Sequence, residues 1–181
     1  MDLYGGREID LPMAPILILL GIFLLAGGII HAMGHPLICE CGYVKLWHGG
    51  IDDAEVSQHF IDTYSEVLHG IIIYYVIYYA MRLFAQDRPA GALGLLIVAS
   101  FAAVWEILEN TPFIVSYAKT TLVRVDVGDS VINSTVDMLA TIVGYLTAAR
   151  SPGWLIAILV YLSFFVFVFP RDNFWISLTL G

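Results

Sequence analysis

The run LPMAPILILLGIFLLAGGII, from Leu11 to Ile30, contains no charged side chain. A helix that crosses the hydrocarbon core of a bilayer needs about 20 mostly apolar residues, each adding about 1.5 Å. The run therefore predicts a membrane-spanning helix. The residues before it, from Met1 to Asp10, hold three acidic side chains and one arginine. A secretory leader would begin with a positively charged segment, so we interpret the run as a retained first span.

Composition extends this interpretation to the whole chain. Of its 181 residues, 59% are hydrophobic and 13% are charged, and the mean hydropathy is +0.82. Soluble domains carry about 25% charged residues. The formal net charge of -8 argues against a basic surface for nucleic acid and against a polybasic attachment to anionic headgroups. We expect one integral membrane domain, residues 1–181, with membrane lipids as partners and no nucleic acid.

Four further segments have the length and the apolar content of membrane spans. The second span begins as a polar helix and becomes apolar after Glu66, and the third stops at Pro112 because the residue before a proline avoids helical angles. In the fourth span, Ala140, Gly144 and Ala148 form a stripe of small residues that permits close helix packing. The predicted fold is an all-α polytopic bundle of about five transmembrane helices. Its spans cover residues 11–30, 57–84, 90–111, 129–149 and 151–170, and its long loops cover residues 31–57 and 117–128.

The unusual polar residues of these spans gather on one side of the bilayer. Spans alternate in direction, so the ends of the first and third spans lie beside the starts of the second and fourth. Within each span the polar residues recur every three or four positions, which places them on one helix face. An acidic group at mid-membrane costs about 2.5 to 3.5 kcal/mol on insertion scales, so we expect these faces to meet one another or water. The stripes are His59, Asp62, Glu66 and His69; Glu106, Glu109 and Asn110; and Asp129, Asn133 and Asp137.

Carboxylate, amide and imidazole groups on neighbouring helices form metal sites in helical bundles, and the same groups form proton relays. Purely structural hydrogen bonds between the helices are the alternative. The catalytic candidates, as acids, bases or ligands of a divalent metal ion, are Glu106, Glu109, Asp137 and His69. The binding candidates are Asn110, Asn133, Asp129, Glu66, Asp62 and His59.

The first long loop contains a second, weaker candidate metal site. His35, Cys39, Cys41 and His48 offer the imidazole and thiolate ligands that zinc prefers, but their spacing is not that of a standard finger. The separation of Cys39 and Cys41 is too short for an unstrained disulfide. We expect free thiols, packed in the loop or bound to a metal ion.

Five segments together resemble an uncharacterised alphaproteobacterial family of multi-pass inner-membrane proteins. This resemblance implies a location in the bacterial cell inner membrane and carries no established activity. The pattern of an early histidine, a Glu-x-x-Glu/Asn pair and an Asp-x3-Asn pair is more distantly similar to the VanZ-like group, which implies a helical bundle around a polar pocket. The segments are ICECGYVKLWHGG (38–50), SQHFIDTYSEVLHG (57–70), WEILENTPFIV (105–115), GDSVINSTVDMLA (128–140) and RDN (171–173).

Three functions follow from these patterns. The first is a membrane-embedded enzyme or binding protein for a lipid or a lipid-linked headgroup. The second is a small proton-coupled transporter, and the third is a structural or assembly subunit that forms an oligomer or a membrane complex through the Ala140–Gly144–Ala148 stripe. Basic residues in the short turns favour a cytoplasmic amino terminus.

Overall fold

The computed structural model describes residues 13–38, 60–83, 91–121 and 129–168, and within helices it leaves out the side chains of 60–64, 118–121, 154 and 162–168. These residues form helices and no strands, which confirms the predicted all-α class. The helices are α1 (Met13–Ala32), α2 (Phe60–Leu83), α3 (Ala92–Glu109), α4 (Pro112–Thr121), α5 (Val131–Arg150) and α6 (Gly153–Val168).

Three of the described helices, α1, α3 and α5, are long and apolar enough to cross a membrane. Large apolar side chains cover the outer surface of the bundle, among them Leu24 and Phe101, which are 76% and 63% exposed. Exposed apolar area of this extent suits contact with lipid. The other two predicted spans correspond to α2, which includes Glu66 and His69, and to α6, which has 16 residues. The total of five spans therefore stays a prediction.

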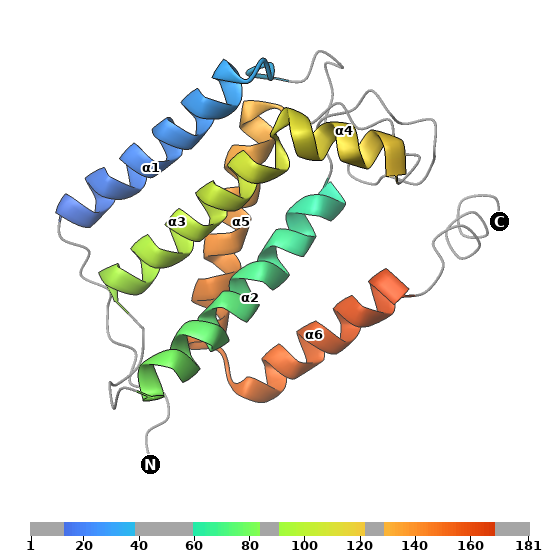
Figure 1. Cartoon of the computed structure of the whole chain (residues 1–181). Coiled ribbons are helices and arrows are strands. Elements are labelled where there is room, and N and C mark those ends of the chain that lie inside the picture. Colours follow the sequence, from blue (N-terminus) through green and yellow to red (C-terminus); the bar gives the residue numbers. More distant parts are fainter. Residues whose placement is uncertain (1–12, 39–59, 84–90, 122–128, 169–181) are drawn as a thin grey trace.

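The helix directions bring the predicted helix ends together. Figure 1 shows α1 and α3 running in one direction and α2 and α5 in the other, so that α1 and α3 end where α2 and α5 begin. We call this the polar end of the bundle. The sequence predicted a loop from Tyr117 onward, but α4 continues to Thr121. Pro112 both ends α3 and starts α4, because proline is excluded from a helix interior and favoured in a first turn.

Two glycines set the closest helix contact. A Cβ atom added to Gly70 in α2 would collide with the carbonyl oxygen of Thr141, and one added to Gly144 in α5 would collide with the carbonyl oxygen of Val67. The backbones of α2 and α5 therefore touch at two points one helical turn apart. Gly144, Ala140 and Ala148 are all buried, so the small-residue stripe packs as predicted.

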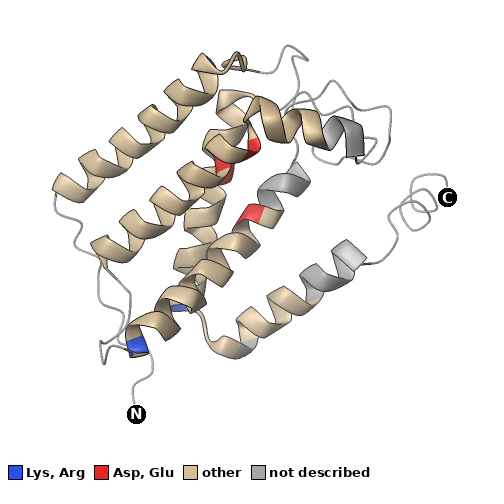
Figure 2. Cartoon of the chain, viewed as in Figure 1, with Lys and Arg blue, Asp and Glu red and all other residues tan. Residues whose placement is uncertain are grey.

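Charge is separated along the bundle. Among the described side chains, Arg82 lies in the last turn of α2 and Arg150 in the last turn of α5, at the end opposite the polar end. Figure 2 shows acidic residues, coloured red, in the other half of α2 and near the end of α3. A core of Ile71, Val98 and Tyr145, with their apolar neighbours, lies between the two groups.

Candidate functional site

The start of α5 is fixed by three polar contacts. The Ser130 hydroxyl caps the helix by accepting a hydrogen bond from the Asn133 amide at 3.2 Å. The amides of Val131 and Ile132 donate to the carbonyl oxygens of Pro36 and Leu37 at 3.0 and 3.1 Å. The first turn of α5 thus has acceptors for amides that the helix itself leaves unpaired. The segment after α1 thereby sets the position of the polar stripe on α5.

Asn110 joins the end of α3 to the start of α5. Its side-chain amide donates to the Glu106 carbonyl at 3.0 Å and to the Ser134 hydroxyl at 3.1 Å, and its side-chain oxygen accepts from the Asp129 amide at 2.8 Å. The buried His35 ring donates from Nε2 to the Asn110 carbonyl at 2.9 Å. Asn110 itself is 1% exposed. Its hydrogen bonds hold Glu106 and Asp129 on facing helix ends.

Three carboxylates meet beside this junction. One oxygen of each of Glu106, Asp129 and Asp137 lies within 4.8 Å of the other two, and we call these residues the acidic triad. Glu106 and Asp137 are both buried, and Asp129 is partly exposed. Asp137 Oδ2 accepts a hydrogen bond from the Asn133 side chain at 2.7 Å. Glu106 Oε2 is buried and has no hydrogen-bond partner within the described part of the chain.

The three carboxylates of the acidic triad repel one another when they are ionised. Two negative charges 4.8 Å apart repel by about 3.5 kcal/mol at an effective dielectric constant of about 20. The two arginines whose side chains are described lie at the opposite end of the bundle (Figure 2). Three ionised carboxylates at this spacing need shared protons or a bound cation. Carboxylate oxygens are the ligands preferred by hard divalent cations such as Mg²⁺ and Ca²⁺.

A second polar group lies further along α2 and α5. Glu66 is buried, and its Oε1 lies 2.8 Å from His69 Nδ1 while its Oε2 accepts from the Thr141 hydroxyl at 2.9 Å. The Thr141 oxygen is also 3.1 Å from the Asp137 carbonyl oxygen, so its single proton is shared between two acceptors. Thr141 thereby connects this second group to the turn of α5 that carries Asp137.

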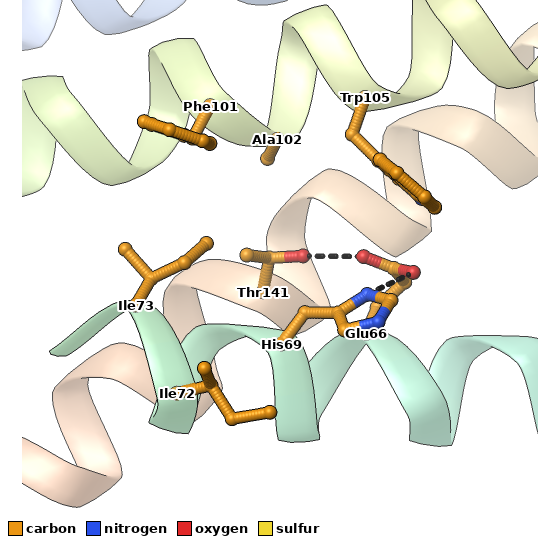
Figure 3. Close-up of a pocket in the computed structure, with 8 residues that line it drawn as sticks. All are labelled: Glu66, His69, Ile72, Ile73, Phe101, Ala102, Trp105 and Thr141. Atoms are coloured by element: carbon orange, nitrogen blue, oxygen red, sulfur yellow. Dashed lines mark hydrogen bonds and ion pairs between the residues drawn. The ribbon is translucent and has the colours of Figure 1, made fainter. Parts of the chain in front are cut away.

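A pocket of about 170 Å³ opens beside the second group. We call it the α2–α3 pocket, because most of its lining comes from these two helices. Figure 3 shows Phe101, Ala102 and Trp105 of α3 facing α2, with the hydrogen-bonded Glu66 and His69 at one side. The edge of the His69 ring packs on Trp105, with the ring centres 5.6 Å apart. The lining residues are Glu66, His69, Ile72, Ile73, Phe101, Ala102, Trp105 and Thr141.

The structure divides the predicted site residues between two groups. Glu106, Asp129, Asn133 and Asp137 lie together with Asn110, whereas Glu66 and His69 form the second group. Glu109 is exposed in the last turn of α3 and is outside the acidic triad, where Asp129 contributes the third carboxylate. Cys39, Cys41, His48 and His59 lie outside the described residues, as does the side chain of Asp62.

Thr141 and Trp105 belong to the site but were not predicted from the sequence patterns. Thr141 continues the four-residue spacing of Asp129, Asn133 and Asp137, so the polar stripe itself was a signal for it. Trp105 had no comparable signal. From the sequence alone, an apolar residue beside Glu106 would be interpreted as an ordinary lipid-facing position. Its place in the pocket depends on the packing of α2 against α3.

The fold and the site of the described residues define a class: a helical protein with three helices long and apolar enough to cross a membrane and a buried acidic centre at one end. The chain belongs to the family described as "Protein of unknown function (DUF2585)", which matches residues 30–180. This confirms the predicted membership of an uncharacterised family, and the likeness to the VanZ-like group stays a prediction.

Its relatives come from alphaproteobacteria. A UPF0314 protein of Rhizobium meliloti is 36% identical over 169 residues, which cover 91% of this chain and 83% of the relative. A UPF0314 protein of Agrobacterium fabrum is 36% identical over 164 residues, covering 88% and 80%. A third, from Novosphingobium aromaticivorans, is 36% identical over 167 residues, covering 88% and 83%. No solved structure matches the chain.

Proposed function

We propose that this protein binds a divalent cation at the acidic triad and uses it to bind or transform a lipid or lipid-linked headgroup at the membrane surface. The observation that carries the proposal is the buried Glu106 Oε2, which has no hydrogen-bond partner among the described residues although it belongs to a cluster of three carboxylates. A buried acceptor without a donor costs about 1 to 3 kcal/mol, and a bound cation removes that cost.

The surroundings of the triad support a cation in preference to a purely structural cluster. Asn110, Ser134 and Asn133 hold the surrounding backbone and side chains in place and add no positive charge. Hydrogen-bonded supports of this kind fix the geometry of metal ligands in other proteins. Asp129 is partly exposed, so at this residue the acidic triad is open to the outside of the bundle.

The position of the triad near the end of α3 is consistent with binding of a lipid headgroup. Glu106 is three residues from the last residue of α3, and Asp129 precedes α5. At about 1.5 Å per residue, Glu106 lies about 5 Å from the helix end, near the level where lipid headgroups begin. A divalent ion at this level would polarise an anionic headgroup oxygen and offset its charge.

Cation titration of the full-length protein in mild detergent tests the proposal. After removal of bound metal, we expect saturable binding of Mn²⁺, followed by electron paramagnetic resonance, with Mg²⁺ and Ca²⁺ as competitors. Glu106→Gln and Asp137→Asn should each weaken binding by about tenfold or more, because each removes a charged ligand. Glu109→Gln is the matched control, since it changes an exposed glutamate outside the triad, one turn along the same helix, and should weaken binding far less than Glu106→Gln does.

Two results would contradict the proposal. One is equal binding by the wild type and by Glu106→Gln. The other is no binding together with an infrared band of a protonated carboxyl group that disappears in Glu106→Gln, which would show that the triad shares protons and would favour the proton-coupled transporter.

A further inference from the structure

The outer wall of the α2–α3 pocket faces the lipid. Ile72, Phe101 and Trp105 line the pocket and are 56%, 63% and 47% exposed. Phe101 and Trp105 belong to α3, which is long and apolar enough to cross a membrane. The pocket therefore opens sideways into the hydrocarbon region instead of towards water. Any ligand that occupies it comes from the bilayer.

The lining changes character along the pocket. On α2 it passes from Glu66 and His69 to Ile72 and Ile73, and on α3 it passes from Trp105 to Phe101. Both changes run in the same direction, away from the polar end, because α2 and α3 are antiparallel (Figures 1 and 3). The ligand that matches this gradient has a polar group nearest the acidic triad and a hydrocarbon chain that points to the middle of the bilayer.

The volume limits the part of the ligand that can be held. An engineered apolar cavity of about 150 Å³ takes one benzene molecule. The α2–α3 pocket, at about 170 Å³, thus holds a short length of one chain and not a whole two-chain lipid. The remainder of the molecule stays in the bilayer.

We propose that the α2–α3 pocket binds a membrane lipid at the junction between its polar part and one hydrocarbon chain. The chain lies against Ile73 and Phe101, and the adjoining ester, hydroxyl or amide group meets the Glu66–His69 pair. This inference rests on the proposed function, since it supplies the route by which a lipid headgroup reaches the acidic triad. The Thr141 hydroxyl, bonded to Glu66 and close to the Asp137 carbonyl, joins the two sites.

Photolabelling tests the pocket directly. The full-length protein is placed in phosphatidylethanolamine vesicles that contain a small fraction of phosphatidylglycerol with a diazirine in one acyl chain, and labelled residues are mapped by mass spectrometry. Leu17 and Leu24 of α1, which are also exposed, report ordinary contact with bulk lipid. We expect labelling at Ile73 and Phe101 to exceed that reference by about fivefold, because a site with preferential affinity is occupied above its bulk share.

A larger side chain inside the pocket should abolish the excess of photolabelling over the α1 reference. Ala102 is 2% exposed and lines the pocket, so Ala102→Phe should reduce labelling of Phe101 to the α1 level. Ile73→Phe fills the same space from α2 and replaces Ala102→Phe if that variant does not fold. In Ile73→Phe, labelling is measured at Phe101 alone, because the mutation changes the other labelled residue. Val104→Phe is the control, since Val104 is on the exposed face of α3 and does not line the pocket. Equal labelling of the pocket and α1, or an excess that survives both pocket variants, would overturn the inference.

The cation titration separates this inference from the proposed function. Ala102→Phe should keep the Mn²⁺ affinity of the wild type, because it leaves the three carboxylates in place. Pocket labelling at the bulk level with intact cation binding would reject the lipid route alone. Strong pocket labelling without any cation binding would reject the metal centre and leave the lipid pocket standing.

Discussion

Gly70 in α2 lies directly against the carbonyl oxygen of Thr141 in α5. The hydroxyl of the same Thr141 donates to Glu66, one turn before Gly70 on α2. The closest backbone contact in the bundle and the polar corner of the α2–α3 pocket therefore depend on one residue. A change in helix packing at this crossing should therefore also displace the polar corner of the pocket.

Replacing either crossing glycine should destabilise the protein. In Gly70→Ala and Gly144→Ala the new methyl group meets backbone atoms, which cannot rotate away as a side chain can. We expect each to lower the free energy of unfolding by about 3 kcal/mol, the upper part of the range for overpacked cores. Thermal unfolding in detergent, followed by circular dichroism, measures the loss.

Gly21→Ala is the matched control for that series. Gly21 lies within α1, and nothing would be within 4 Å of its added Cβ atom. Alanine is favoured over glycine in a helix by about 0.5 to 1 kcal/mol, so this variant should be as stable as the wild type or slightly more so. Equal stability of Gly70→Ala and Gly21→Ala would show that α2 and α5 are further apart than described.

Asn110→Ala should weaken the connection between α3 and α5. It removes one hydrogen bond from the buried Ser134 hydroxyl and one from the Asp129 amide, so we expect a loss of about 2 to 4 kcal/mol in unfolding free energy and weaker cation binding. Ser100→Ala removes an exposed hydroxyl that bonds within α3 and should have little effect. A cation affinity unchanged in Asn110→Ala would mean that the triad does not depend on this junction.

Thr141→Val keeps the shape of the side chain and removes its hydroxyl. Glu66 then loses a donor in a buried position, and we expect a loss of about 1 to 2 kcal/mol in unfolding free energy together with reduced photolabelling of the pocket. The comparison is Thr147→Val, whose hydroxyl is exposed and bonded within α5. Equal effects of the two variants would contradict a role for the bond between Thr141 and Glu66.

Topology can be tested by reporter fusions after Arg88 and after Lys119. Basic residues in short turns concentrate on the cytoplasmic side, and the described Arg82 and Arg150 share one end of the bundle. We expect a fusion after Arg88 to report the cytoplasm and a fusion after Lys119 to report the opposite side. Reporters on the same side would show that α3 does not cross the membrane and would contradict the prediction of five spans.

Helix periodicity was sufficient to predict most of the architecture. Because polar residues cannot face lipid without cost, the spacing from Asp129 to Asp137 predicted both a buried face and its end of the bundle. The small stripe at Gly144 predicted close packing but not its partner, since Gly70 has no sequence relation to it. Glu109 and Glu106 are equivalent in the sequence, and only the packing of α5 against α3 decides which is buried.

Other parts of the site depend on tertiary contacts that no local pattern encodes. The His35 ring reaches the carbonyl of Asn110, 75 residues away. The pairing of Pro36 and Leu37 with the start of α5 uses backbone groups, which leave no trace in side-chain identity. The α4 helix was missed because its residues include several polar side chains in a short segment after a proline.

The two glycine contacts also decide how the bundle can move. Where backbones touch, α2 and α5 cannot slide or tilt independently, so the pair behaves as one rigid body. The α3 helix packs on both α1 and α5, because Ala102 and Ala103 share a buried cluster with Ala26 of α1 and Met138 of α5. A lipid that enters the α2–α3 pocket as we propose would therefore have to move α3 away from α2, while the hydrogen bonds of Asn110 keep the polar end of α3 attached to α5.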